Sequence, residues 1–264
     1  MKSFALALSG GGLLGAAHLG ALHFLDKKGA RAAGVAGTSA GGLVASLYAL
    51  HIPMARVIRV GRDITQHPRD YFHLNTRGLI HEIWPSTNPA TGLLLPQDFL
   101  GALLNLAPDA TSTQDWTIPT VLTAVDLVTL TAIAFTNHPA TTPDHGSWTR
   151  VAGQPLKLAM QATMALPGLF QAPRWHGRVL VDGGTADTLP IDWATALNVG
   201  FVIAIDVATP PHVQAHQVGL AEVLSRSENY AINTLSALRT SHPAPIVVRP
   251  DTANGPFFGF QDYE

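Results

Sequence analysis

The chain has 264 residues and a mass of 27.9 kDa, which is enough for one sizeable hydrophobic core. Apolar residues make up 47% of the sequence and charged residues 13%, a balance that excludes an intrinsically disordered chain. The net charge of −2 and the lack of a basic block argue against a nucleic-acid partner. Since no linker-like segment divides the chain, we predict a single domain over residues 1–264.

Cysteine usage and hydropathy bound the remaining classes. The sequence has no cysteine, which excludes disulfides, thiolate metal sites and cysteine nucleophiles. The apolar stretch after Lys2 stops at Ser9, short of the roughly 7 to 15 apolar residues of a signal peptide. The sequence contains no run of about 18 or more apolar residues, so no transmembrane helix is predicted. We therefore expect a cytoplasmic protein, in contact with membranes at most peripherally.

The first 50 residues predict a βαβα unit. Residues 3–8 form a continuous apolar run, typical of a strand buried on both faces of a parallel sheet. A glycine-rich turn leads into a predicted helix over 13–25. Residues 32–36 predict the second strand, and 43–50 continue as an apolar helix.

The rest of the chain continues to alternate between the two periodicities. Helices are predicted at 53–66, 96–106, 155–165 and 213–239, and strands at 117–125, 130–136, 200–207 and 245–248, with a hairpin at 170–184. This pattern predicts an α/β fold with a mainly parallel central sheet flanked by helices. The irregular segment 67–95 is either a substrate-facing lid or a packed loop, and the lid interpretation extends over 67–117.

Ser39 stands at the tip of the predicted turn between the second strand and its helix. The sequence Gly37-Thr38-Ser39-Ala40-Gly41 fits the G-x-S-x-G nucleophile elbow, in which glycines flank a serine on a sharp, crowded turn. The alternative is a tight turn without chemistry. The preceding strand and the following helix favour the elbow, because this motif requires that order.

The glycine loop after the first strand fits two kinds of site. Gly10-x-Gly12-x-x-Gly15 matches the dinucleotide fingerprint, but the second strand ends in Gly37-Thr38-Ser39 where a ribose-binding acid is expected. The other interpretation is an oxyanion hole made of backbone N–H groups at a helix N-terminus. Because carboxyl ends of adjacent parallel strands meet at one edge, this loop and Ser39 would share a crevice.

Several residues are candidates to accept the serine proton. A triad of Ser39, Asp206 and either His212 or His216 has the chain order of an α/β-hydrolase. Asp182 ends the second strand of the predicted hairpin before two glycines, and it is either a turn former or a functional carboxylate. A metal-ligand spacing such as H-E-x-x-H is not found at His67, His73, His81, His138 and His145.

Three stretches in order resemble the patatin-like phospholipase family. They are residues 8–22 with Ser9-Gly10-Gly11-Gly12, residues 37–42 around Ser39, and Val181-Asp182-Gly183-Gly184. Residues 162–170 and 246–250 are also similar, whereas 67–117 and 213–240 match least. The resemblance implies a patatin-like three-layer sandwich and a Ser-Asp dyad that hydrolyses acyl esters of lipids without a histidine, metal or cofactor.

The resemblance also implies a role for each motif residue. Ser39 would be the nucleophile and Asp182 the general base. The backbone N–H groups of Gly10, Gly11 and Gly12 would form the oxyanion hole, and the motifs are completed by Gly15, Gly37, Gly41, Gly183 and Gly184. The substrate would be a phospholipid, lysophospholipid or acylglycerol, met at a lipid surface or as single amphiphiles. The oligomeric state does not follow from the resemblance.

One departure from the family pattern bears on the substrate. Leu14 stands where the family usually has Arg or Lys, so a cation beside the oxyanion hole is missing. We therefore expect a tilt toward neutral or less charged esters. Three alternatives stay open: a Ser-His-Asp carboxylesterase or thioesterase, a protein that binds NAD or FAD with its glycine loop, and a non-catalytic lipid-binding or regulatory module.

Overall fold

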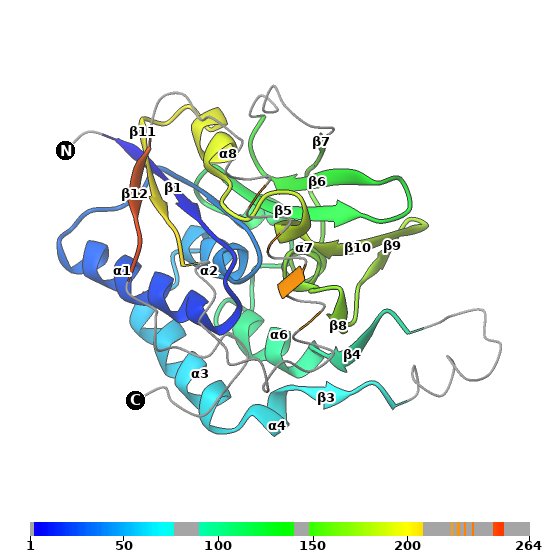
Figure 1. Ribbon diagram of the computed structural model, residues 1–264. Coiled ribbons are helices and arrows are strands. Elements are labelled where there is room, and N and C mark those ends of the chain that lie inside the picture. Colours follow the sequence, from blue (N-terminus) through cyan, green and yellow to red (C-terminus); the bar gives the residue numbers. More distant parts are fainter. Residues whose placement is uncertain are drawn as a thin grey trace.

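The computed structural model describes residues 3–76, 90–139, 148–207 and 245–250, together with single helical positions between 223 and 234 (Figure 1). Most of the helix predicted at 213–239 therefore lies outside the described residues.

Helices and strands alternate along the described chain. The α-helices are α1 (Ala16–Lys27), α2 (Ala40–Ala49), α3 (Met54–Gln66), α4 (Pro68–Tyr71), α6 (Gln97–Leu104), α7 (Leu156–Met164) and α8 (Ile191–Ala196). Three 3-10 helices are η1 (Gly12–Gly15), η2 (Thr113–Asp115) and η3 (Gly183–Thr185). The strands are β1 (Phe4–Leu8), β2 (Gly34–Gly37), β3 (His73–Leu74), β4 (Gly92–Leu95), β5 (Thr120–Asp126), β6 (Thr131–Thr136), β7 (Trp148–Val151), β8 (Gly168–Phe170), β9 (Arg174–Trp175), β10 (Arg178–Asp182), β11 (Phe201–Ile205) and β12 (Ile246–Val248).

The central sheet is mainly parallel, as the sequence predicts. β12, β11, β1, β2 and β5 pair in this order and all run in parallel. β10 and β6 pair antiparallel to β5, β9 follows β10, and β7 pairs with β6. Leu8 lies opposite both Ile205 and Gly37. The carboxyl ends of β11, β1 and β2 therefore lie at the same level of the sheet.

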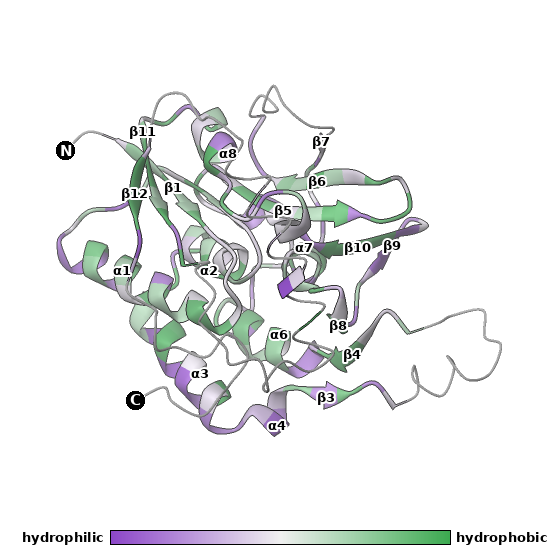
Figure 2. Cartoon of the chain, in the orientation of Figure 1, coloured by the Kyte–Doolittle hydropathy of each residue, from purple (hydrophilic) through white to green (hydrophobic). Residues whose placement is uncertain are grey.

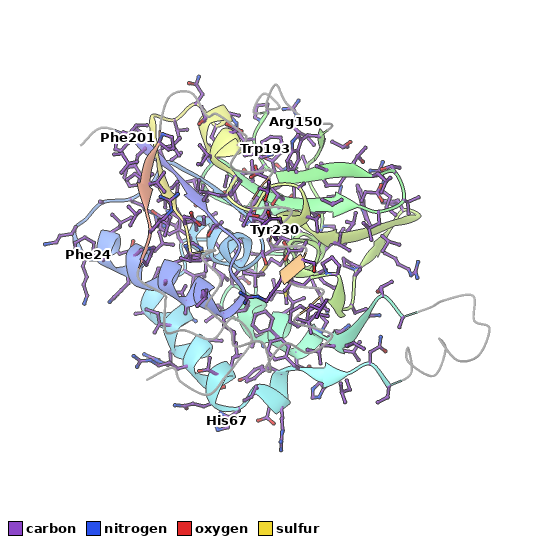
Figure 3. The ribbon with its side chains drawn as sticks, viewed as in Figure 1. Phe24, His67, Arg150, Trp193, Phe201 and Tyr230 are labelled. Carbon is purple, nitrogen blue, oxygen red and sulfur yellow. The ribbon has the colours of Figure 1, made fainter. Side chains whose placement is uncertain are left out.

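Helices cover both faces of this sheet (Figure 1). On one face, Trp193 of α8 is fully buried against small residues of β1 and β2, including Ala5, Ala7 and Ala36, and Figure 3 labels its position. The other face packs against α2, whose residues from Gly41 to Ala49 are all buried. Figure 2 shows that the central strands are mostly hydrophobic, which is what burial on both faces requires.

The structure corrects the sequence-based elements in three places. Segment 67–95, predicted to be irregular, contributes α4 and the strands β3 and β4. These strands form a small sheet with β8, in the order β3-β4-β8. β7 and α8 were also not predicted. Each of these elements has six residues or fewer, so its pairing or packing partner decides its conformation more than its own periodicity does.

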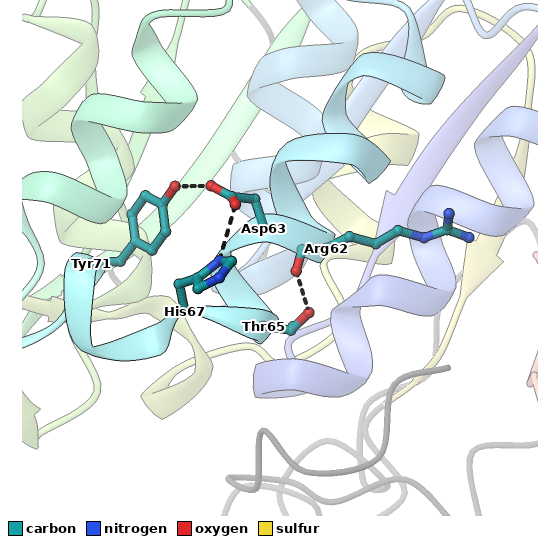
Figure 4. A network of polar contacts seen from close by, with 5 residues as sticks. All are labelled: Arg62, Asp63, Thr65, His67 and Tyr71. Carbon is teal, nitrogen blue, oxygen red and sulfur yellow. Dashed lines mark hydrogen bonds and ion pairs between the residues drawn. The ribbon is translucent and has the colours of Figure 1, made fainter.

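Polar contacts fix the corner where α3 ends and α4 begins (Figure 4). The Tyr71 hydroxyl donates a hydrogen bond to Asp63 Oδ2, and His67 Nδ1 lies 3.1 Å from Asp63 Oδ1. These two contacts lower the pKa of the Asp63 carboxyl, with the Tyr71 hydrogen bond as the main cause. The corner directs the chain from α3 into β3 and the small sheet.

Candidate active site

Ser39 occupies the turn between β2 and α2 in a strained backbone conformation. Its φ is 56° and its ψ is −125°, in a region that residues with a side chain rarely adopt. A Cβ on Gly37 would lie 2.4 Å from the Gly41 oxygen, and one on Gly41 would lie 2.4 Å from the Leu8 oxygen. The turn therefore closes only with glycine at both positions, as a nucleophile elbow requires.

The glycine loop runs beside this serine. A Cβ on Gly10 would lie 3.4 Å from Ser39 Cβ, and one on Gly15 only 2.5 Å from Ala40 Cβ. The Gly10 N–H donates to the Thr188 oxygen at 2.9 Å, so it is already engaged. Gly12 begins η1, where a backbone N–H has no partner within the helix. Within the described chain, the backbone bonds outside regular elements include none donated by Gly11 or Gly12.

A buried hydrogen-bond network of Ser9, His18 and Val207 holds the glycine loop in place. The Ser9 hydroxyl donates to the Gly10 oxygen and accepts from the Val207 N–H, both at 2.8 Å. His18 Nε2 donates to the Ser9 oxygen at 2.9 Å. Burial lowers the pKa of His18 to about 4, although the Ser9 hydrogen bond and Asp206 act in the opposite direction. His18 is therefore a neutral support of the loop, a role that its helical position did not reveal.

Asp182 lies at the end of β10, on the same edge of β5 as the end of β2. β6 pairs with Val121–Asp126 along one edge of β5, so β2 and β10 must both use the other edge. Gly37 lies opposite Leu122, and Asp182 lies opposite Ala124. These two positions on β5 are about 6.6 Å apart. β2 and β10 therefore approach each other end to end, and their carboxyl ends meet at Thr123.

Close contacts mark this meeting point. The Thr38 and Thr123 hydroxyls are 2.7 Å apart, and Thr38 Oγ1 also donates to the Asp187 oxygen at 2.9 Å. A Cβ on Gly183 would lie 2.1 Å from Thr123 Oγ1, so this position admits only glycine. The side chain of Thr38 therefore points toward the chain segment that follows Asp182.

The surroundings of Asp182 hold its carboxylate in place. Asp182 is 1% exposed, and its Oδ1 accepts a hydrogen bond from the Gly184 N–H at 2.7 Å. A Cβ on Gly184 would lie 3.1 Å from the same oxygen. Ser39 is also buried, at 7% exposed.

The end of α7 contacts the backbone of both residues. Thr163 Oγ1 accepts the Ser39 N–H at 3.0 Å, and the Ala165 oxygen accepts the Asp182 N–H at 2.9 Å. Thr163 is fully buried, and a Cβ on Gly42 would lie 2.6 Å from its hydroxyl. Sequence reasoning placed Thr163 only within the similar stretch 162–170 and gave it no role. Because its partner is a backbone N–H, no side-chain motif could have revealed the contact.

Of the other candidate proton acceptors, the structure describes Asp206 but not the two histidines. Asp206 follows β11, and its Oδ2 accepts a hydrogen bond from Arg249 Nε at 3.1 Å. His212 and His216 lie outside the described residues. Among the described residues, no cluster of three or more histidine or carboxylate side chains could hold a metal ion. Nor does that part of the chain contain a helix long and apolar enough to cross a membrane.

The fold and the serine turn define an α/β protein with a nucleophile-elbow geometry, and comparison with known proteins gives its family. The model of the patatin-like phospholipases matches residues 6–195. The chain belongs to the patatin-like phospholipase family.

Several curated proteins are similar over most of this chain. An uncharacterized NTE family protein of Mycobacterium tuberculosis is 27% identical over 77% of this chain and 48% of its own length. Patatin-like phospholipase domain-containing protein 6 of Homo sapiens is 28% identical over 79% of this chain and 14% of its own length. The chain thus spans about half, or less, of these relatives. Among solved structures, VipD from Legionella pneumophila aligns with a TM-score of 0.47 and 16% identity, over 89% of this chain and 54% of VipD.

The buried neutral His18 predicts a loss of stability in mild acid. In the unfolded chain His18 takes up a proton near pH 6.5, whereas in the folded protein it does so only near pH 4. The contribution of neutral His18 to the free energy of unfolding is therefore fully present above pH 6.5. It is lost progressively as the pH falls from 6.5 to 4. Between pH 7 and pH 4.5 we expect His18 to remove about 2.5 kcal/mol from the free energy of unfolding.

Urea unfolding of the wild type and of His18→Gln at both pH values measures this contribution. Glutamine can still donate to the Ser9 oxygen but does not titrate. The pH-dependent loss should shrink by about 2.5 kcal/mol in the variant. An equal loss in both proteins would show that His18 is not responsible.

Proposed function

We propose that this protein hydrolyses fatty-acyl esters of lipids through a dyad of Ser39 and Asp182. The observation that carries the proposal is the end-to-end approach of β2 and β10 on one edge of β5, which brings the two buried residues to one level of the sheet. The strained turn at Ser39 supports a nucleophilic role, because such strain concentrates at functional sites. Relatives with phospholipase or lysophospholipase in their names also favour a lipid ester as substrate.

In the first half of the reaction, Ser39 Oγ attacks the acyl carbonyl carbon while the Asp182 carboxylate accepts the hydroxyl proton. The carbonyl oxygen becomes negatively charged in the tetrahedral intermediate. We assign the oxyanion contacts to the N–H groups of Gly11 and Gly12, since the Gly10 N–H bonds to Thr188. The intermediate collapses to an acyl-enzyme as the ester C–O bond breaks, and the leaving alkoxide takes the proton from Asp182.

In the second half, Asp182 accepts a proton from a water molecule that attacks the acyl-enzyme carbonyl. Collapse of this second intermediate breaks the bond to Ser39 Oγ, which recovers its proton, and releases the fatty acid. A carboxylate in water is a weak base for this purpose. The burial of Asp182 excludes most of that water, and the Gly184 N–H keeps Oδ1 oriented.

The side chain of Leu14 bears on the type of lipid. It is 3% exposed and packs within the main hydrophobic core. A side chain buried in the core does not reach a head group, so the preference for neutral or weakly charged esters that we propose rests only on the lack of a cation at this position.

Substitution of the two strand-end carboxylates, Asp182 and Asp206, distinguishes the Ser-Asp dyad from a histidine-dependent triad. We expect Asp182→Asn to lower kcat for a short-chain ester about 10³-fold, within the usual contribution of a general base. Asp206→Asn should retain near wild-type turnover, because Asp206 already pairs with Arg249. Steady-state kinetics of both variants, each checked for folding by circular dichroism, measure the difference. The reverse order, with a similar loss in His212→Gln or His216→Gln, would replace the dyad by a Ser-His-Asp triad.

Thr163 is proposed as a positioning residue for the nucleophile. Its hydroxyl accepts the Ser39 N–H, so Thr163→Val removes the acceptor while keeping the side-chain shape. A slightly misplaced nucleophile loses rate more than affinity, so we expect kcat to fall roughly 10- to 100-fold with little change in KM. Thr163→Ser should restore most of the rate.

Thr113→Val provides a matched control for this loss. Thr113, the first residue of η2, is also fully buried, and its hydroxyl accepts the Gln154 N–H at 3.2 Å. The Thr113→Val variant should lower Tm about as much as Thr163→Val but leave kcat near the wild-type value. Equal kcat losses in the two valine variants would mean that Thr163 acts only through stability.

A further inference from the structure

The connection between β5 and β6, residues 127–130, has its polar groups turned inward. Asp126 is fully buried, and its carboxylate accepts hydrogen bonds from the Val128 N–H at 2.9 Å and the Thr129 hydroxyl at 2.5 Å. Burial alone would raise the pKa of Asp126, but these hydrogen bonds and the nearby Arg178 guanidinium lower it. The turn is thus closed around an ionised carboxylate and has a defined shape.

The apolar side chains of the same turn point to solvent. Leu127, Val128 and Leu130 are 47%, 60% and 79% exposed, and Figure 2 shows the connection as hydrophobic. Leu130 has a φ of 53°, where glycine or asparagine would be less strained. A soluble loop normally has the opposite polarity. These three side chains, which we call the apolar tip, are exposed by an ordered turn at a conformational cost.

The apolar tip lies at the same end of the central sheet as the candidate active site. β5 runs parallel to β2 and continues past the level of Ser39 and Asp182 before it reaches the tip. Asp126, the last residue of β5 before the tip, follows Ala124, the partner of Asp182, by about 6.6 Å of strand length. In Figure 1 the β5–β6 connection projects at the right of the view, away from α1.

A basic hairpin lies next to the apolar tip. The Leu127 N–H donates to the Val179 oxygen at 2.9 Å, which joins the tip to the start of β10. The hairpin over 174–178 has the sequence Arg-Trp-His-Gly-Arg and contains no acidic residue. Arg174 is exposed, whereas the Arg178 guanidinium lies over the Trp175 ring and 3.6 Å from the buried Asp126 carboxylate. Exposed apolar side chains beside an exposed arginine are typical of surfaces that enter the interface of a bilayer.

We propose that the apolar tip and the basic hairpin together seat this protein on the anionic surface of a lipid aggregate. The inference rests on the proposed lipid substrate and names the surface through which that substrate is reached. The three apolar side chains insert among the head groups, and the exposed Arg174 pairs with lipid phosphates. Three side chains supply much less than the roughly 1,200 to 2,000 Å² that a stable protein interface buries, so a lipid surface is favoured over a second copy.

Vesicle binding tests the proposal separately from catalysis. In the inactive Ser39→Ala background, we compare the parent with the double variant Val128→Thr/Leu130→Asn, in which asparagine tolerates the positive φ of position 130. The vesicles contain phosphatidylcholine, with and without phosphatidylglycerol. We expect about tenfold weaker partitioning of the double variant, because removal of apolar side chains from the interface lowers affinity. Binding of the parent should also weaken without phosphatidylglycerol or at high salt.

Phe24→Asn is the matched control. Phe24 is 59% exposed on α1 and lies at the left of the view in Figure 3, away from the β5–β6 connection. Its variant should bind vesicles like the parent. Equal binding of the parent and the double variant, or an equal loss in Phe24→Asn, would overturn the proposal. A loss accompanied by a change from dimer to monomer in light scattering would assign the tip to a second copy instead.

Activity measurements distinguish failure of this proposal from failure of the proposed function. With an active Ser39, the ratio of vesicle-lipid hydrolysis to soluble-ester hydrolysis should fall about tenfold in the double variant. An unchanged ratio would contradict a role of the tip at the lipid surface. A parent protein that binds vesicles but hydrolyses neither substrate would contradict the dyad and leave the surface assignment standing.

Discussion

The approach of β2 and β10 on a single edge of β5 is the constraint on which the candidate site depends. A strand has two edges, and β6 occupies one of them along Val121–Asp126. The remaining edge is shared by a parallel strand that ends at Gly37 and an antiparallel strand that ends at Asp182. Residues far apart in the sequence are thereby brought to one point. The small Gly183 next to Thr123 is what allows the two ends to come so close.

The surrounding structure holds this arrangement against its own strain. A non-glycine residue at the φ of Ser39 costs on the order of 1–3 kcal/mol and persists only where neighbouring contacts fix it. The Thr163 hydroxyl binds the Ser39 N–H, and Ala165, two residues later, binds the Asp182 N–H. α2 follows the strained turn directly and is buried from Gly41 to Ala49. The His18 and Ser9 network fixes the glycine loop on the opposite side. The site is therefore rigid before a substrate arrives.

Strong local patterns made much of this fold predictable, and non-local contacts explain the rest. The continuous apolar run of β1 and the Gly-x-Ser-x-Gly turn at Ser39 have one dominant interpretation each. β3 has only two residues, and α8 is fixed by the packing of Trp193, so neither has a periodic signal of its own. In the site, Asp182 was found through a family resemblance, because a strand-end Asp before two glycines is also an ordinary turn. The contact of Thr163 with a backbone N–H, and the engagement of the Gly10 N–H by Thr188, depend on tertiary structure that no local pattern encodes.

The central claim is that Ser39 is activated by Asp182, and covalent labelling tests it most directly. The protein is treated with a fluorophosphonate serine probe, its intact mass is measured, and the modified peptide is mapped. The account predicts one probe per chain on Ser39, with labelling that is strongly slowed in Asp182→Asn and unchanged in Asp206→Asn. Well-folded wild type that stays unlabelled in the presence of detergent or lipid would contradict the account. Labelling of Ser39 that is independent of Asp182 would contradict the dyad.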